Sequence, residues 1–99
     1  MTLGGGSTAV PNTIFAALPQ MGAAEVLCTL VLVRETYGCD RPLARLFYSD
    51  FMRLTGIGSK NTVSRALEAV ERRGFFRRTG QRAEWEVVEQ PHRRTPRSI

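Results

Sequence analysis

A short stretch rich in glycine, serine and lysine, LTGIGSKNT at residues 54–62, is the first place in this chain where phosphate chemistry could occur. A nucleotide-binding loop of the G-x-x-x-x-G-K-[ST] type wraps phosphates with backbone amides and adds a lysine and a hydroxyl. Here Gly58 is followed by Ser59 and then Lys60, and no glycine stands five residues before Gly58. A dinucleotide-binding G-x-G-x-x-G loop needs a glycine where this chain has Asn61. Neither nucleotide loop is therefore predicted.

The same stretch fits a turn between two helices. A short helix is expected at Asp50–Thr55, with Ser49 as its N-cap, and Gly56-Ile57-Gly58 follow it as a turn. A longer helix is expected over about residues 59–73, because it starts at a serine suited to an N-cap and ends before Gly74. This order predicts a helix-turn-helix.

The 59–73 helix has two distinct faces. Apolar residues recur at helical spacing and predict a buried stripe of Val63, Ala66, Leu67 and Val70. The opposite face is polar and comprises Asn61, Arg65, Glu68 and Arg72, with Thr62 and Ser64 on its flanks. Such a polar face is what a helix lying in the major groove of DNA would present.

Roles in DNA contact follow from the side-chain types. Asn61 can bond bidentately to adenine and Arg65 to guanine, each pair discriminating by ~1–3 kcal/mol, with Ser64 as a third base contact. The predicted phosphate contacts are Ser49, Lys60, Thr62, Arg72, Arg77, Arg78 and Arg82. Alternatives stay open: Asn61 can be an ordinary second-turn residue, Arg65 can pair with Glu68, and the later arginines can simply be solvated.

A β-hairpin is expected after this helix. Strand-like residues occupy Phe75–Arg78 and Glu84–Glu89, and Thr79-Gly80-Gln81 interrupt them. Arginines gather at the hairpin tip, where they would contact the DNA backbone or minor groove. The aromatic residues Phe75, Phe76 and Trp85 are expected to pack in the core rather than to stack on bases.

The first half of the chain is expected to supply the core helix, Ala23–Tyr37, ended by Gly38 as its C′ residue. Its polar residues Glu25, Thr29 and Thr36 fall near one stripe, which we expect to face solvent while the apolar residues face the core. Leu32 falls within that stripe and is a candidate contact to a partner. A short strand is expected next, in the segment flanked by Leu43, Leu46 and Phe47.

Length and charge limit the function. The 99 residues suit one small domain, expected at 10–90, with a flexible leader at 1–9 and a basic disordered tail or linker at 91–99. Net charge is +5, but residues 1–40 carry −2 and residues 41–99 carry +7. A basic half-domain favours a polyanionic partner such as nucleic acid.

Other classes of function find little support. Cys28 and Cys39 are expected to be reduced thiols, and with His92 in the tail they do not make a zinc site. No cofactor, metal or small-molecule substrate is predicted, and no nucleophile and base that would make an enzyme. The apolar run Ala23–Val33 is too short to cross a bilayer, and no secretory signal is seen, so a soluble, cytoplasmic, nucleoid-associated protein is expected.

Several short motifs carry a resemblance to a known family. They are V-P-N at 10–12, R-E-T-Y-G at 34–38, T-G at 55–56 and T-V-S-R-A-L at 62–67. Over about Val10–Arg78 the chain resembles the N-terminal winged-helix DNA-binding domain of phage and plasmid replication proteins, the replication protein O type. More broadly, the last motif is similar to that of many bacterial winged helix-turn-helix regulators.

The resemblance implies a mainly α fold with a small β-hairpin (α+β), namely a winged helix-turn-helix with a three-helix core plus a wing. It also implies origin recognition in double-stranded DNA, with a helicase or loader, or self-association, as further partners. A transcriptional regulator that binds a palindrome as a dimer is the first alternative. The second is a protein-interaction module that uses the apolar part of the Ala23–Tyr37 helix.

Overall fold

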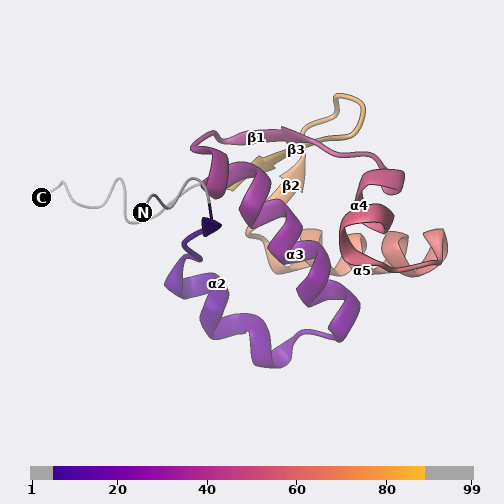
Figure 1. Ribbon diagram of the computed structural model, residues 1–99, viewed down its shortest axis with the longest axis horizontal. Coiled ribbons are helices and arrows are strands. Elements are labelled where there is room, and N and C mark those ends of the chain that lie inside the picture. Colours follow the sequence, from indigo (N-terminus) through magenta and orange to yellow (C-terminus); the bar gives the residue numbers. More distant parts are fainter. Residues whose placement is uncertain (1–5, 89–99) are drawn as a thin grey trace, which may run out of the picture.

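The computed structural model describes residues 6–88, so most of the expected leader and all of the expected basic tail lie outside the described residues. The chain is mainly helical with a small three-stranded antiparallel sheet (Figure 1), which confirms the α+β class. In chain order the elements are α2 (Asn12–Ala17), the 3-10 helix η1 (Leu18–Gln20), α3 (Ala23–Thr36), the 3-10 helix η2 (Tyr37–Cys39), β1 (Leu43–Arg45), α4 (Tyr48–Thr55), α5 (Lys60–Arg73), β2 (Phe76–Arg78) and β3 (Glu84–Val87).

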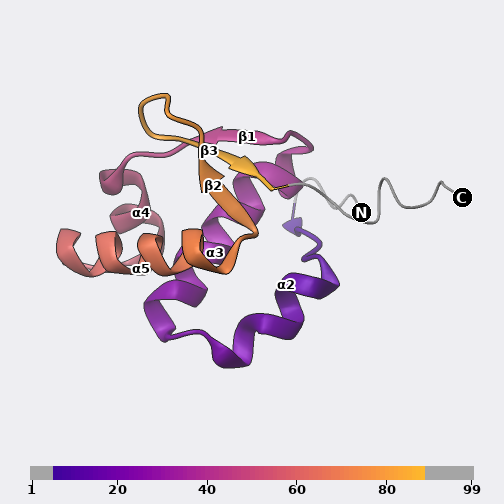
Figure 2. The same cartoon turned by 180° about the vertical axis from the view of Figure 1, so that it is seen from behind.

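The sheet has the order β1-β3-β2, so β3 lies in the middle (Figure 2). The expected hairpin is present as β2 and β3, with Arg77 opposite Glu86, and β1 adds to its other edge with Ala44 opposite Trp85. The second hairpin strand is shorter than expected, because it ends at Val87. The last residue of the expected strand, Glu89, lies outside the described residues.

The helix α4 begins two residues earlier than expected. Its N-cap is Phe47, and Ser49 lies inside the first turn, so the prediction of Ser49 as N-cap is wrong. The reason is Asp50, whose carboxylate reaches back and accepts a hydrogen bond from the Phe47 N–H at 2.9 Å. The C-terminal end is as expected, since Gly56 adopts the left-handed conformation with φ of +80°.

Both ends of α5 are confirmed. The Ser59 hydroxyl accepts a hydrogen bond from the Thr62 N–H at 3.2 Å, and Gly74 ends the helix with φ of +90°. All four residues of the expected apolar stripe are buried, namely Val63, Ala66, Leu67 and Val70. The polar face of α5 therefore points away from the core.

The expected orientation of α3 is wrong. The stripe thought to face solvent is buried, including Glu25, Thr29, Leu32 and Thr36, while Leu27 and Leu30 are 40% and 37% exposed. Two of these polar residues, Thr36 and Glu25, have hydrogen-bond partners within the fold. The Thr36 hydroxyl donates to the Leu32 carbonyl of its own helix at 2.7 Å, and Glu25 bonds to an arginine of α5. Leu32 is thus a core residue and not a partner contact.

The end of α3 also differs from expectation. Gly38 directly follows the α3 C-cap, Tyr37, as expected, but it lies inside η2 and is not left-handed; the left-handed residue is Asp40, with φ of 55°. A different constraint acts on Gly38, because a Cβ there would meet the Thr8 hydroxyl oxygen at 2.8 Å. Glycine is needed for this close approach, which seats the start of the described chain against η2.

The lead-in contains a helix that the sequence did not predict. α2 begins after Pro11 and buries Ile14 in the core, while Phe15 stays 64% exposed. In Figure 1, α2 lies on the far side of α3 from the sheet. A six-residue helix with only one fully buried side chain leaves too weak a periodic pattern to be recognised.

The core forms where α3, α4 and α5 meet the inner side of the sheet. Phe76 and Trp85 are buried, and Phe76 meets Tyr37 edge to face with ring centroids 6.4 Å apart. This confirms the expectation that these aromatic residues pack in the core; Phe75 is half-buried and packs against it. At the C-terminal end of α5, Arg73 donates to both carboxylate oxygens of Glu25, from Nε at 2.6 Å and from Nη2 at 3.3 Å.

Candidate nucleic-acid interface

The polar face of α5, comprising Asn61, Arg65, Glu68 and Arg72 and called the α5 face below, is exposed along its whole length. The side chains of Asn61 and Arg65 are one helical turn apart, about 6 Å along the axis. In the part of the chain that the structure describes, Arg65 forms no ion pair, and in particular none with Glu68. The open alternative of an Arg65–Glu68 pair is therefore not what the structure contains.

The N-terminal end of α5 gathers further polar groups. The Ser59 hydroxyl occupies the Thr62 N–H, so the backbone N–H groups of Lys60 and Asn61 remain without an intrahelical acceptor. The Lys60 ammonium lies 5.4 Å from the centre of the Tyr48 ring at the start of α4, a cation–π contact. Backbone donors and a positive helix end are a suitable environment for a phosphate group.

The hairpin carries three arginines, and two of them are paired. Arg77 bonds to Glu86 across the hairpin. Arg78 lies over the Trp85 ring at 5.0 Å, and its Nε is 3.7 Å from a carboxylate oxygen of Glu71 on α5. These are exposed pairs of the kind that contributes about 0–1 kcal/mol, so a phosphate can compete for both arginines.

The third hairpin arginine, Arg82, has a different environment. Its guanidinium carbon lies 5.7 Å from the centre of the Phe47 ring, and within residues 6–88 no carboxylate pairs with it. The turn before it is held by Thr79, whose hydroxyl donates to Glu84 at 2.7 Å and accepts from the Gln81 N–H at 3.1 Å. Among the described residues, Arg82 is thus a positive charge with no paired carboxylate, on a turn held by hydrogen bonds.

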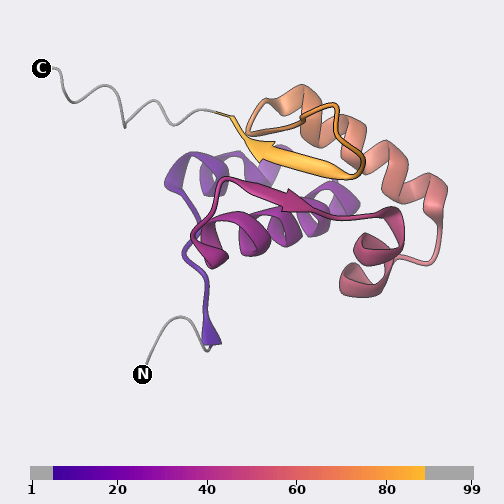
Figure 3. The ribbon, with the colours of Figure 1, turned by 90° about the horizontal axis from the view of Figure 1, so that it is seen from above.

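The starts of α4 and α5 and the hairpin turn (residues 79–83) lie at one end of the molecule, as Figures 1 and 3 show. The contacts of Lys60 with Tyr48 and of Arg82 with Phe47 join these three segments. Most of the sequence-predicted site residues belong to these three segments, because Ser49 lies in the first turn of α4, Lys60, Asn61, Thr62, Ser64 and Arg65 lie in the first two turns of α5, and Arg82 lies in the hairpin turn. Ser64 is half-buried and the others are exposed.

Arg72 is placed apart from this end. It follows Lys60 by twelve residues, which is about 18 Å along the axis of α5. Its neighbour Arg73 is bound to Glu25 and to the Gln20 carbonyl, so it belongs to the core and not to the α5 face.

Sequence reasoning missed the aromatic part of this end, Phe47 and Tyr48. No spacing in the sequence connects Phe47 with Arg82 or Tyr48 with Lys60, because both contacts join segments that only the fold brings together. Both aromatic residues flank the start of α4.

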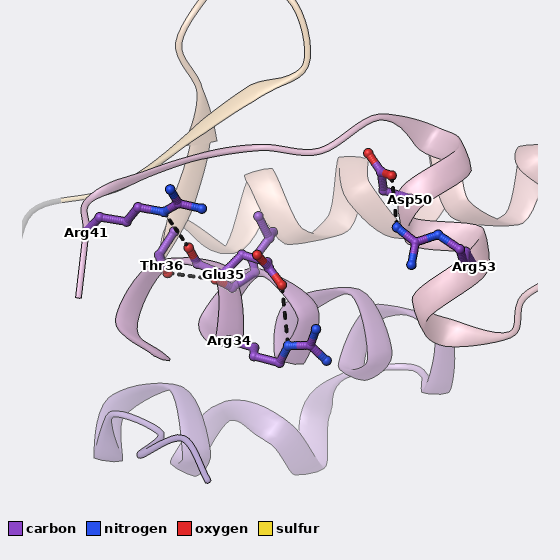
Figure 4. A network of polar contacts seen from close by, with 7 residues as sticks. Arg34, Glu35, Thr36, Arg41, Asp50 and Arg53 are labelled. Atoms are coloured by element: carbon purple, nitrogen blue, oxygen red, sulfur yellow. Dashed lines mark hydrogen bonds and ion pairs between the residues drawn. The ribbon is translucent and has the colours of Figure 1, made fainter. Parts of the chain in front are cut away.

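Three exposed arginines outside this end, Arg34, Arg41 and Arg53, are engaged locally. Figure 4 shows Arg34 beside Glu35 and Arg53 beside Asp50, and Arg41 donating to the Glu35 carbonyl. The distances are 3.3, 3.2 and 3.3 Å. The surface of α3 and α4 shown there thus offers less available positive charge than the α5 face.

The remaining chemistry of the described region is limited. Both cysteines are free, and burial raises the pKa of the Cys28 thiol to about 11, so it stays protonated. Among residues 6–88 no group of three or more histidine, cysteine, aspartate or glutamate side chains is placed to hold a metal ion. Within the same range, every helix is too short or too polar to cross a membrane.

Comparisons of the chain with protein-family models, with curated proteins and with solved structures found no match.

Proposed function

We propose that this domain binds double-stranded DNA sequence-specifically as a winged helix-turn-helix, with α5 in the major groove. The observation that carries the proposal is the pair Asn61 and Arg65. Both are exposed and without a partner in the described chain, on the outward face of a helix that is capped at both ends. Their side chains suit adenine and guanine edges, and a single helical turn separates them.

The hairpin β2–β3 is the proposed wing, and it lies on the DNA backbone. Arg82 supplies a free positive charge, and Arg77 and Arg78 exchange their exposed carboxylate partners for phosphates. Lys60, Thr62 and the first amides of α5 bind a further phosphate at the helix start. This arrangement gives both groove recognition and backbone contact at one end of the molecule.

Origin recognition by a phage- or plasmid-type replication initiation protein is the proposed biological role. It is supported by the V-P-N, R-E-T-Y-G and T-V-S-R-A-L motifs. A helicase or its loader is then the expected protein partner, and transcription regulation remains the alternative.

The experiment is selection of binding sites from a random duplex library, followed by titration of the selected site at several salt concentrations. We expect a short enriched site and a steep loss of affinity with salt. A directly repeated site supports an origin-binding module, whereas a palindrome with half-sites one helical turn apart supports a dimeric transcription regulator.

Substitutions then test whether α5 is the helix that contacts the bases. Arg65→Ala should reduce affinity for the selected site by ~1–3 kcal/mol and relax the preference at one base pair. Arg34→Ala is the matched control, since it removes the same charge from an exposed residue of α3 and should bind as the parent does. If the Arg65 variant binds every duplex like the parent, α5 is not the reading helix.

A protein-interaction module is the second candidate, and the exposed Leu27 and Leu30 of α3 are the observation that favours it. These leucines are three residues apart and lie on one side of the helix. This candidate predicts no salt-sensitive affinity for any duplex, so the same titration separates the two functions.

A further inference from the structure

A hollow of about 300 Å³ lies between the hairpin turn and the segment that joins β1 to α4. Leu46 and Leu67 give it an apolar lining, and the aromatic rings of Phe47, Tyr48 and Trp85 border it. Its volume is at the lower end of the range of small-molecule sites. It does not include Asn61 or Arg65, so it is separate from the proposed base-reading residues.

The hollow combines flat rings with positive charge. Phe47 is 41% exposed although it is large and apolar, and the Arg82 guanidinium already lies over its ring. Arg78 lies over Trp85 in the same way. Rings with guanidinium groups beside them suit a flat aromatic group that carries a negative charge.

The polar lining supplies hydrogen-bonding groups for such a ligand. Gln81 is exposed and offers both a donor and an acceptor, and Glu84 also lines the hollow, with one carboxylate oxygen bound to Thr79. Arg82 has no carboxylate partner among residues 6–88, so its charge is available to a phosphate.

The walls of the hollow are fixed to one another. The Leu46 N–H donates to the Ala83 carbonyl at 2.7 Å, which ties the β1–α4 segment to the hairpin turn. Ala83 has φ of 57°, a left-handed conformation that is unfavourable for a residue with a Cβ. Backbone strain of this kind is retained where the surrounding structure holds it, and here it lies in the lining itself.

We infer that this hollow binds one nucleotide, with the base against Phe47 and Tyr48 and the phosphate on Arg82. The nucleotide can be free or part of a DNA strand, and only the second source rests on the proposed function. A DNA strand bound at the start of α5 would lie close to the hollow, because Tyr48 also contacts Lys60 there.

The chain offers its own reporter, since Trp85 is its single tryptophan and borders the hollow. Trp85 fluorescence would be followed while the full chain is titrated with each of the four 5′-mononucleotides. A short single-stranded oligonucleotide would then be titrated in the same way. We expect a saturable change, with affinity reduced at least about ten-fold in Arg82→Gln, because a charged hydrogen bond to phosphate is lost.

Two further variants define the test. Phe47→Leu keeps an apolar side chain but removes the ring, and we expect several-fold weaker binding. Arg34→Gln, on α3 and outside the hollow, removes one positive charge like the Arg82 variant and should bind as the parent does. Circular dichroism of each variant establishes that the fold is retained.

The outcomes distinguish a free nucleotide from a nucleotide within a strand. They also separate nucleotide binding in the hollow from DNA binding by the α5 face. Saturation by mononucleotides supports a free-nucleotide site, and saturation by the oligonucleotide alone supports a nucleotide within a strand. No change in Trp85 fluorescence with either probe, or an equal change in Arg82→Gln, overturns the inference. Duplex affinity measured in parallel by anisotropy shows whether the α5 face binds DNA independently of the hollow.

Discussion

The pairing of Glu71 with Arg78 leads to a testable prediction about the affinity of this domain for DNA. Glu71 lies on α5, and its carboxylate contacts both the Arg78 backbone N–H, at 3.4 Å, and the Arg78 guanidinium, at 3.7 Å. In the DNA complex proposed above, Arg78 would have to give up part of this pairing. Glu71→Gln keeps an oxygen acceptor for the N–H but removes the charge, so the variant should bind duplex DNA more tightly.

The size of the effect follows from exposure and distance. The two side chains are 42% and 40% exposed, so their pairing is worth about 0–1 kcal/mol. Removing the Glu71 charge also removes its repulsion of phosphates, about 0.4 kcal/mol at ~10 Å in water before salt screening. Together these contributions predict affinity about two- to ten-fold higher at low salt, with the gain smaller as salt is raised.

The assay is anisotropy of a labelled duplex at several salt concentrations, with the selected site and a scrambled site compared. Glu71 is proposed to act on the backbone contact of Arg78, so both sites should gain affinity by the same factor. Glu35→Gln is the control, because it removes an equal charge from α3. Unchanged or weaker binding by Glu71→Gln, or an equal gain in the control, would refute the reasoning.

Three further predictions concern the fold. Thr29→Val should raise the free energy of unfolding by about 1 kcal/mol in urea titrations, because among the described residues the buried hydroxyl has only the Met21 sulfur, at 3.8 Å, as acceptor; a decrease would contradict this. Asp50→Asn should lower the melting temperature at neutral pH. The hydrogen bond from the Phe47 N–H to the Asp50 carboxylate lowers the pKa of this carboxyl below 3.8. The stabilisation by the charged carboxylate is therefore present above pH 3.8 and is lost as the pH falls through the lowered pKa. The melting temperatures of variant and parent should converge in acid. A thiol reagent at neutral pH should modify the exposed Cys39 quickly and spare Cys28, whose pKa of about 11 keeps it a thiol until the solution becomes strongly alkaline; two fast thiols would show that the core opens.

The sequence was most informative where local chemistry decides the structure. α5 was predicted in full because its cap, its apolar stripe and its terminal glycine all act within one helix. Ser59, Val63 and Gly74 each do what their residue types favour. The outward position of Asn61 and Arg65 followed directly from that stripe.

The prediction failed where long-range partners decide. In α3, the burial of Glu25 depends on Arg73, 48 residues later, which neutralises it and accompanies it into the partly buried region. Thr36 was misplaced for a local reason, because its hydroxyl bonds to the Leu32 carbonyl of the same helix and can therefore be buried. Residue type alone places both side chains in solvent, so the pattern assigned the wrong face to the core.

The aromatic part of the candidate site could not be predicted from the sequence either. The exposed Phe47 reads as an ordinary apolar residue until the hairpin turn brings Arg82 over its ring. The hollow beside them is bounded by the β1–α4 segment and the hairpin turn, which the hydrogen bond between Leu46 and Ala83 joins. Such arrangements depend on tertiary geometry and leave no periodic signal.

The ion pair between Arg73 and Glu25 has a consequence for kinetics. It fixes the last turn of α5 to the first turn of α3, while Ser59 caps the other end of α5. The helix is therefore ordered before any partner arrives, and little conformational entropy is lost on association. Encounter and electrostatic attraction, rather than folding of the contact surface, should then set the association rate.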